Sequence, residues 1–111
     1  MESVIEINES GIAIVRFKGR LDLLSAANAR AEMAKLVQDG RERLVVDLGE
    51  VSFIDSSGLG ALISGLKAAR QAGGDLRLAR LGEQARMLFR LTNLDKVLNI
   101  YSSVEDALAG Y

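Results

Sequence analysis

The sequence lacks cysteine, histidine and proline. Without cysteine the chain has no disulfide bonds and no catalytic thiol, and without both cysteine and histidine the common zinc sites are excluded. The absence of histidine also excludes every acid–base mechanism that depends on an imidazole. Because proline is missing, helices and strands must be separated by other residues, chiefly the 11 glycines.

An excess of charge of one sign and long hydrophobic runs are also missing. Fourteen basic residues stand against fifteen acidic ones, a formal charge of −1. This balance argues against nucleic acid as a partner, because neutralising phosphates requires a basic face. The apolar runs are far shorter than a membrane span, and the first residues lack the basic start of a signal peptide. We therefore expect a cytoplasmic protein that binds neither nucleic acid nor a membrane.

The residues that are present have the composition of one globular domain. The chain has 111 residues, of which 49% are hydrophobic and 26% are charged. A chain of this length buries roughly two-thirds of its unfolded surface, enough for a core. No repeat or shift in composition marks a boundary, so residues 1–111 are predicted to form a single domain.

Strand-like and helix-like segments alternate along the chain. Short segments rich in β-branched and apolar residues predict strands at 4–7, 12–17 (ended by Gly19), 44–48, 76–80 and 98–101. Helical spacing of apolar residues predicts helices at 25–39 (capped by Ser25), 57–72, about 85–92, and after Ser102 or Ser103. The order predicts an α/β fold in which an N-terminal β-hairpin precedes alternating helices and strands. The sheet is expected to be mixed but mainly parallel, with helices packed against it.

Two groups of side chains have simple structural interpretations. Met33 and Met87 are expected to pack in or near the core. Four arginines that lie close together in the sequence are balanced by acidic residues elsewhere, so a solvated face is a better interpretation than a nucleic-acid site. These are Arg77, Arg80, Arg86 and Arg90.

The segment 51–60 is the one that carries chemistry. Asp55, Ser56 and Ser57 are three consecutive residues of the types that cap helices, and an apolar helix follows at once. One such side chain is enough to begin a helix, so capping alone leaves the other two unexplained. Gly58 and Gly60 each weaken a helix by about 1 kcal/mol relative to alanine, which suggests close approach of another molecule to the backbone.

A serine hydroxyl at the start of a helix is a suitable place for a reversible negative charge. The free amides and the positive end of the helix dipole stabilise an anion there. A phosphate adds about −1.5 to −2 charges, which are costly to bury beneath a docked partner. The segment 51–60 therefore predicts a binding surface that phosphorylation can switch off.

The segment 55–60, Asp-Ser-Ser-Gly-Leu-Gly after an apolar strand, resembles the signature of bacterial anti-sigma factor antagonists, the STAS domain. The resemblance extends over nearly the whole chain. The supporting segments are 19–22, 47–48, 53–55, 73–76 and 81–94.

This resemblance implies a partner-switching function. Such proteins bind an ATP-dependent serine kinase with a histidine-kinase-like fold that also sequesters a sigma factor, and binding of the unphosphorylated antagonist releases the sigma factor. The kinase then phosphorylates and ejects the antagonist, and a metal-dependent serine phosphatase of the PP2C type restores it. The resemblance implies no catalytic activity, cofactor or metal site in the chain itself.

Carried over by position, the resemblance assigns roles to three adjacent residues. Ser56 is the expected phosphoacceptor. Asp55 is expected to orient that hydroxyl or to engage the kinase, and Ser57 is the expected helix cap.

The rest of the docking face is also carried over by position. Gly58, Leu59 and Gly60 are expected to give the kinase access to the backbone and an apolar contact. Arg20 and Asp22, with their neighbours, are expected to form the second part of the face. Some family members have glutamate where this chain has Arg20, and an exchange of charge on a docking face should alter the choice of partner.

Three unrelated site types fit the sequence less well. A receiver domain needs an acidic pair after the first strand, where this chain has Asn8-Glu9-Ser10, and a lysine after the last strand, which is missing. A dinucleotide site needs a third small residue where this chain has Ile63, and no P-loop is present. A serine hydrolase needs a stronger base than the Asp55 carboxylate.

A second function of the same domain cannot be distinguished by fold class, because it uses the same fold. STAS-like domains also serve as constitutive subunits of transport complexes, where they dock on an ATPase without a phosphorylation cycle. The intact Asp-Ser-Ser triplet at 55–57 favours the phosphorylation switch over this non-phosphorylated adaptor.

Overall fold

The computed structural model describes residues 1–111 and contains one five-stranded sheet with the order β1-β2-β3-β4-β5. β1 and β2 pair antiparallel as a hairpin, and all other neighbouring strands pair parallel. This arrangement confirms the predicted hairpin and the mainly parallel mixed sheet. The strands are β1 (Glu2–Ile7), β2 (Ala13–Leu21), β3 (Arg43–Ile54), β4 (Asp75–Ala79) and β5 (Asn99–Tyr101).

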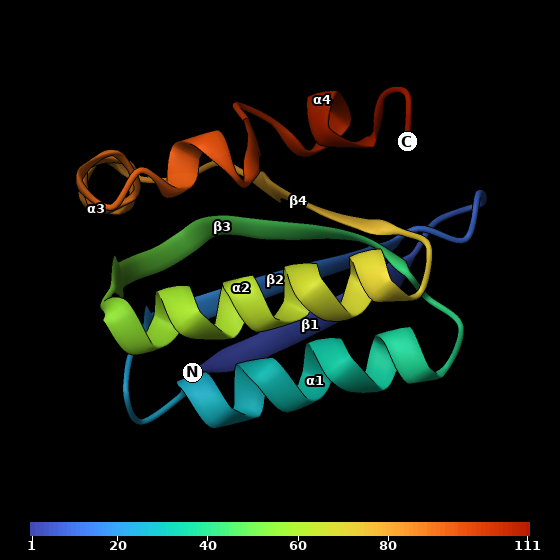
Figure 1. Ribbon diagram of the computed structural model, residues 1–111, viewed down its shortest axis with the longest axis horizontal. Coiled ribbons are helices and arrows are strands. Elements are labelled where there is room, and N and C mark those ends of the chain that lie inside the picture. The colour runs from blue at the N-terminus through green and yellow to red at the C-terminus, as the bar shows by residue number, and fades with distance from the viewer.

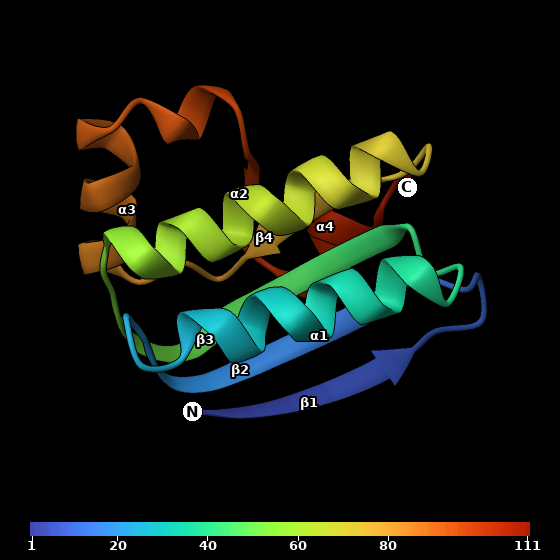
Figure 2. The same ribbon diagram turned by 60° about the horizontal axis from the view of Figure 1, so that its bottom comes forward.

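Helices cover both faces of the sheet (Figures 1 and 2). α1 and α2 run side by side across one face, where 22 buried residues form the main core together with side chains of α3. α4 covers the other face above a cluster of six buried residues. The helices are α1 (Ala26–Gln38), α2 (Ser56–Gln71), α3 (Glu83–Leu91) and α4 (Val104–Leu108), with a 3₁₀ turn at Leu94–Lys96.

Two strands, β2 and β3, continue past their predicted ends toward the starts of α1 and α2. β3 continues through 51–54, where the sequence suggested a loop. The prediction that Gly19 ends β2 is wrong, because the strand continues to Leu21. Gly19 has a φ of +103° at a shift in the β2–β3 register, which marks a bulge. The extra length places Leu21 beside Ile54.

Asp47, in the middle of β3, is the one charged residue that the core buries. Its carboxylate accepts hydrogen bonds from Arg16 Nε (3.2 Å), from Arg80 Nε (2.8 Å) and Nη2 (3.0 Å), and from the amide of Gly49 (3.0 Å). Burial raises the pKa of Asp47, but the hydrogen bonds and charge of Arg80, with Gly49 and Arg16, outweigh this and leave the pKa lowered. Arg80 thus pairs with a buried carboxylate while its own side chain remains 45% exposed, which agrees with the expected solvated face.

The last residue, Tyr111, holds the C-terminal segment against the sheet. Its hydroxyl accepts a hydrogen bond from the amide of Leu44 (2.9 Å) and faces the carbonyls of Leu44 and Asp75 as a donor. Burial is the main cause that raises the pKa of Tyr111 to about 12. Arg77 lies 4.1 Å from the Tyr111 ring centre and donates to two carbonyls at the end of α4, so the expectation of a solvated face is wrong for Arg77.

Of the two methionines expected in or near the core, Met33 is fully buried, but Met87 on α3 is 56% exposed, so that part of the prediction is wrong. Ser103, one of the two serines predicted to precede the last helix, caps α4 by accepting a hydrogen bond from the amide of Asp106. None of the helices combines the length and the hydrophobicity that a membrane span needs.

Candidate functional site

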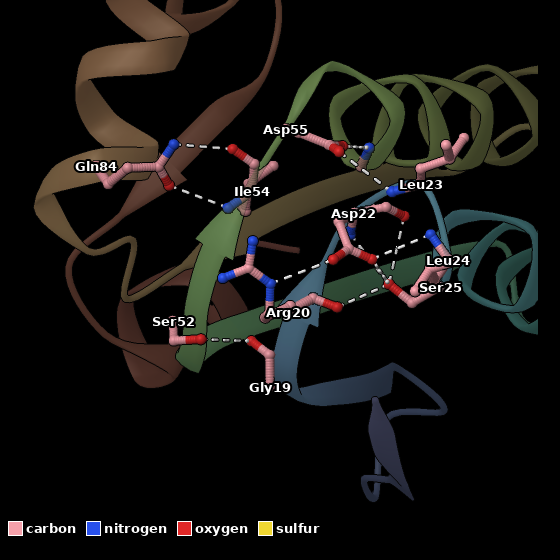
Figure 3. Close-up of polar contacts among 11 residues, drawn as sticks. Gly19, Arg20, Asp22, Leu23, Leu24, Ser25, Ser52, Ile54, Asp55 and Gln84 are labelled. Carbon is pink, nitrogen blue, oxygen red and sulfur yellow. Dashed lines mark hydrogen bonds and ion pairs between the residues drawn. The ribbon is translucent and has the colours of Figure 1, made fainter.

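The predicted site residues meet where the parallel strands β2 and β3 end (Figure 3). β2 leads into a short loop, 22–25, that begins α1, and β3 leads through Asp55 into α2. Parallel neighbours end at the same edge of a sheet, so the two connections lie beside each other. The amide of Asp55 also donates to the carbonyl of Leu21 at 3.3 Å, which joins the two strand ends directly.

Asp55 caps α2 and links the two loops. Its Oδ1 accepts a hydrogen bond from the amide of Gly58 at 3.0 Å, the geometry of a helix N-cap. Its Oδ2 accepts from the amide of Leu23 at 3.2 Å, across to the neighbouring loop. The prediction that Ser57 is the cap is therefore wrong, because Asp55 stands one position before the helix and has the shorter reach to its free amides.

Ser56, the expected phosphoacceptor, is exposed on the first residue of α2. Its hydroxyl makes no hydrogen bond with Asp55, whose two oxygens are engaged with the amides of Gly58 and Leu23. The expectation that Asp55 orients the Ser56 hydroxyl directly is thus wrong for this structure. Asp55 instead determines where Ser56 lies by fixing the backbone on either side.

Gly58 and Leu59 are not open to a partner, contrary to the prediction. A Cβ on Gly58 would lie 2.1 Å from the carbonyl oxygen of Leu21, so glycine is needed for α2 to pack against the end of β2. Leu59 is only 5% exposed and belongs to the main core. Gly60 differs from both, since a Cβ there would have only Arg30 Nη2 nearby, at 3.7 Å. Of these three residues, Gly60 alone leaves backbone accessible.

Arg20 and Asp22 lie on the β2 side of the site. Arg20 Nε donates to Asp22 Oδ2 at 3.2 Å, and the guanidinium lies 4.4 Å from the centre of the Phe53 ring. Partial desolvation raises the pKa of Asp22, but the hydrogen bond from Arg20, followed by that from the amide of Leu24, outweighs it, so the pKa is lowered. Asp22 is therefore held as a carboxylate at the edge of the loop.

Ser25 stands at the N-cap position of α1, as predicted, but its side chain does not cap the helix. Its hydroxyl accepts from the amide of Asp22 at 3.0 Å and donates to the carbonyl of Arg20 at 2.7 Å. These bonds close the loop on itself. The conformation of 22–25 is thus determined by hydrogen bonds within the loop and by Asp55.

The sequence interpretation missed Leu23 and Leu24. Their side chains are 74% and 90% exposed, and they lie in the loop that Asp55 holds beside the start of α2 (Figure 3). The sequence contained a signal for them. Two consecutive leucines stand between a predicted strand and a predicted helix cap, where they fit neither the apolar pattern of the strand nor that of the helix. Neighbouring exposed leucines on a hydrogen-bonded loop are typical of a contact surface.

Comparison with known proteins identifies the family. The sequence profile described as the STAS domain matches residues 5–107. The chain belongs to the STAS domain family. This confirms the predicted resemblance and the predicted fold class, an α/β domain built on a mixed sheet.

Curated relatives of this STAS domain are described as anti-sigma factor antagonists. The anti-sigma-B factor antagonist of Bacillus subtilis (strain 168) is 33% identical over 101 residues, covering 91% of each chain. The solved anti-sigma factor antagonist from Mycobacterium paratuberculosis superimposes with a TM-score of 0.85 at 28% identity, covering 96% of this chain and 90% of that one. The phosphorylated form of the Bacillus cell fate determinant SpoIIAA shares the fold, with a TM-score of 0.76 at 20% identity over 96% of both chains.

Proposed function

We propose that this STAS domain is an anti-sigma factor antagonist, a regulatory binding protein that acts by partner switching. In its unphosphorylated form it docks on an anti-sigma factor that is also an ATP-dependent serine kinase, which then releases its sigma factor. The observation that carries the proposal is that Asp55 links the loop of the exposed Leu23 and Leu24 to the start of α2, where Ser56 is exposed.

Docking is expected to bury the two leucines. Each contributes roughly 1.5–3 kcal/mol when its side chain leaves water completely, so the pair is sufficient to anchor a partner. Their loop is already ordered by Asp55 and Ser25, so little conformational entropy is lost when the partner binds. Asp22 and Arg20 lie at the rim, where charges influence the choice of partner.

Phosphorylation of Ser56 would reverse docking. The Ser56 oxygen attacks the γ-phosphorus of the ATP carried by the kinase, the bond from that phosphorus to the bridging oxygen breaks, and ADP leaves. Asp55 directs its two oxygens at the amides of Gly58 and Leu23, so we expect the group that takes the hydroxyl proton to come from the kinase. The product carries about −1.5 to −2 charges at the edge of an apolar contact, where burying them is costly. Hydrolysis by a PP2C-type phosphatase would restore the serine.

The first experiment asks which residue is modified. The chain is incubated with a candidate kinase and ATP, and intact-mass spectrometry detects the addition of one phosphoryl group. We expect wild type and the matched control Ser57→Ala to be modified and Ser56→Ala to remain unmodified. Modification of Ser56→Ala would contradict the assignment, and binding without any modification would favour the non-phosphorylated adaptor of a transport ATPase.

The same variants test the switch by titration calorimetry with the kinase. Ser56→Ala should bind as wild type does, because Ser56 is exposed and the change adds neither bulk nor charge at the contact. Ser56→Asp should bind at least about tenfold more weakly, a loss of about 1.4 kcal/mol. Its fold should be intact, since aspartate is a good residue at a helix start. Equal affinities for all three proteins would argue against the switch.

A further inference from the structure

Gln84, the second residue of α3, makes two hydrogen bonds to the backbone of a single residue, Ile54 (Figure 3). Its Oε1 accepts from the Ile54 amide at 3.0 Å, and its Nε2 donates to the Ile54 carbonyl at 2.8 Å. Ile54 is the last residue of β3 and directly precedes Asp55 and Ser56. The side-chain amide therefore pairs with the strand end as a backbone peptide group would.

The fold explains why this pairing is needed. β4 pairs with β3 only as far as the Asp47–Ala79 position, so β3 runs on toward Ile54 without β4 beside it. A strand end without a neighbour leaves its amide and carbonyl without protein partners. On its other side, β3 is still paired, because Leu21 of β2 stands opposite Ile54. Gln84 thus completes a clamp whose other half is β2.

We propose that Gln84 is a positioning residue for the phosphorylation of Ser56, an inference that rests on the proposed function. The clamp fixes Ile54 from both sides, and Ile54 leads through the capping residue Asp55 into Ser56. Loss of the clamp would leave the leucines of the 22–25 loop in place but would let the serine hydroxyl move relative to them. Gln84 therefore acts on phosphoryl transfer through the backbone and not by contact with the kinase.

Gln84→Glu is the decisive variant, because it makes the clamp depend on pH. A protonated carboxyl has one donor and one acceptor, as the amide has, and can make both bonds to Ile54. An ionised carboxylate has acceptors only and would face the Ile54 carbonyl with no donor between them. The clamp therefore favours the protonated form, and the pKa of the new carboxyl should exceed the usual value of about 4.3.

The first measurement needs no partner. Amide NMR spectra are recorded from about pH 4 to about pH 8. In Gln84→Glu we expect the Ile54, Asp55 and Ser56 amide signals to titrate together, matching wild type at the acidic end and departing from it at the other. The matched control is Gln71→Glu, the same change at an exposed position in the last turn of α2, where these signals should not move. Signals of Ile54 that follow wild type throughout would overturn the clamp.

The second measurement uses the kinase at neutral pH. We expect kcat for phosphorylation of Gln84→Glu to fall about tenfold or more with a smaller change in KM, since docking still uses the exposed leucines. Gln84→Ala lacks both bonds to Ile54, so its kcat should be lower than that of wild type by a similar factor at every pH. An unchanged kcat in both variants would overturn the positioning role. Phosphorylation of wild type at a residue other than Ser56 would instead overturn the proposed function, and the NMR titration would still decide on the clamp.

Discussion

Two arginine–aspartate pairs with the same chemistry occupy opposite kinds of environment. In the pair of Arg80 with Asp47 the side chains are 45% and 2% exposed, and the nitrogen–oxygen distance is 2.8 Å. In the pair of Arg20 with Asp22 the side chains are 61% and 20% exposed, and the distance is 3.2 Å. The first pair joins strands inside the fold. The second shapes a loop whose leucines face solvent, so we expect the buried carboxylate to serve stability and the exposed pair to serve the proposed recognition of a partner.

The largest effect on stability is expected at the two glycines near the start of α2, one packed against β2 and the other open. Gly58→Ala should lower the free energy of unfolding by about 3 kcal/mol, because the new methyl group would meet the fixed carbonyl of Leu21. Gly60→Ala is the matched control, and it should raise stability by up to about 1 kcal/mol through helix propensity. Urea denaturation measures both. Equal effects would mean that α2 can shift away from β2 without cost.

The second prediction compares a variant that should lose stability with a variant that should lose affinity for the partner. Asp47→Asn should cost about 2 kcal/mol of stability, because a buried carboxylate that serves two guanidinium groups becomes a neutral amide. Its affinity for the kinase should be unchanged. Leu24→Ser should show the reverse, with normal stability and affinity at least tenfold lower, about 1.4 kcal/mol. The division of roles would be refuted if both variants lost the same property.

A smaller effect is expected at Tyr111, the residue that closes the stable end of the sheet. Tyr111→Phe should cost about 1 kcal/mol at neutral pH through the lost hydroxyl contacts. In wild type the raised pKa, about 12 against an ordinary 10, means that the folded state keeps a proton that the unfolded state loses. The hydroxyl's contribution is thus complete below pH 10 and declines as the pH rises toward 12. The stability difference between the two proteins should shrink across that interval.

Local patterns were sufficient to predict the order of the strands and α-helices and the start of α2. The alternation of β-branched and helical segments defined every strand and helix, and the consecutive polar residues before α2 marked the segment that contains Ser56. Strand ends were less well predicted. Val51–Ile54 continues β3 because β2 runs beside it, and a pairing between distant segments leaves no local signal.

The side chains that hold the site together could not be predicted for the same reason. Asp55 was identified, but its bond to Leu23 depends on the parallel pairing of β2 and β3. Gln84 is an ordinary polar residue in an amphipathic helix until α3 is placed beside the end of β3. Gly58 carried a clear signal that was misassigned, since a glycine needed for a close approach looks the same whether the neighbour is Leu21 or another protein.

The placement of the two chain ends has a practical consequence for measuring these affinities. Met1 lies beside Gly19 and lines a shallow hollow together with Arg20, Asp22 and Leu24, whereas Tyr111 is anchored at the far end of the sheet (Figure 2). A purification tag or fluorophore joined ahead of Met1 would lie close to the leucine loop and would lower the measured affinity by obstructing the partner. Labels should therefore follow Tyr111, where attachment to a sensor surface leaves the loops facing the solution.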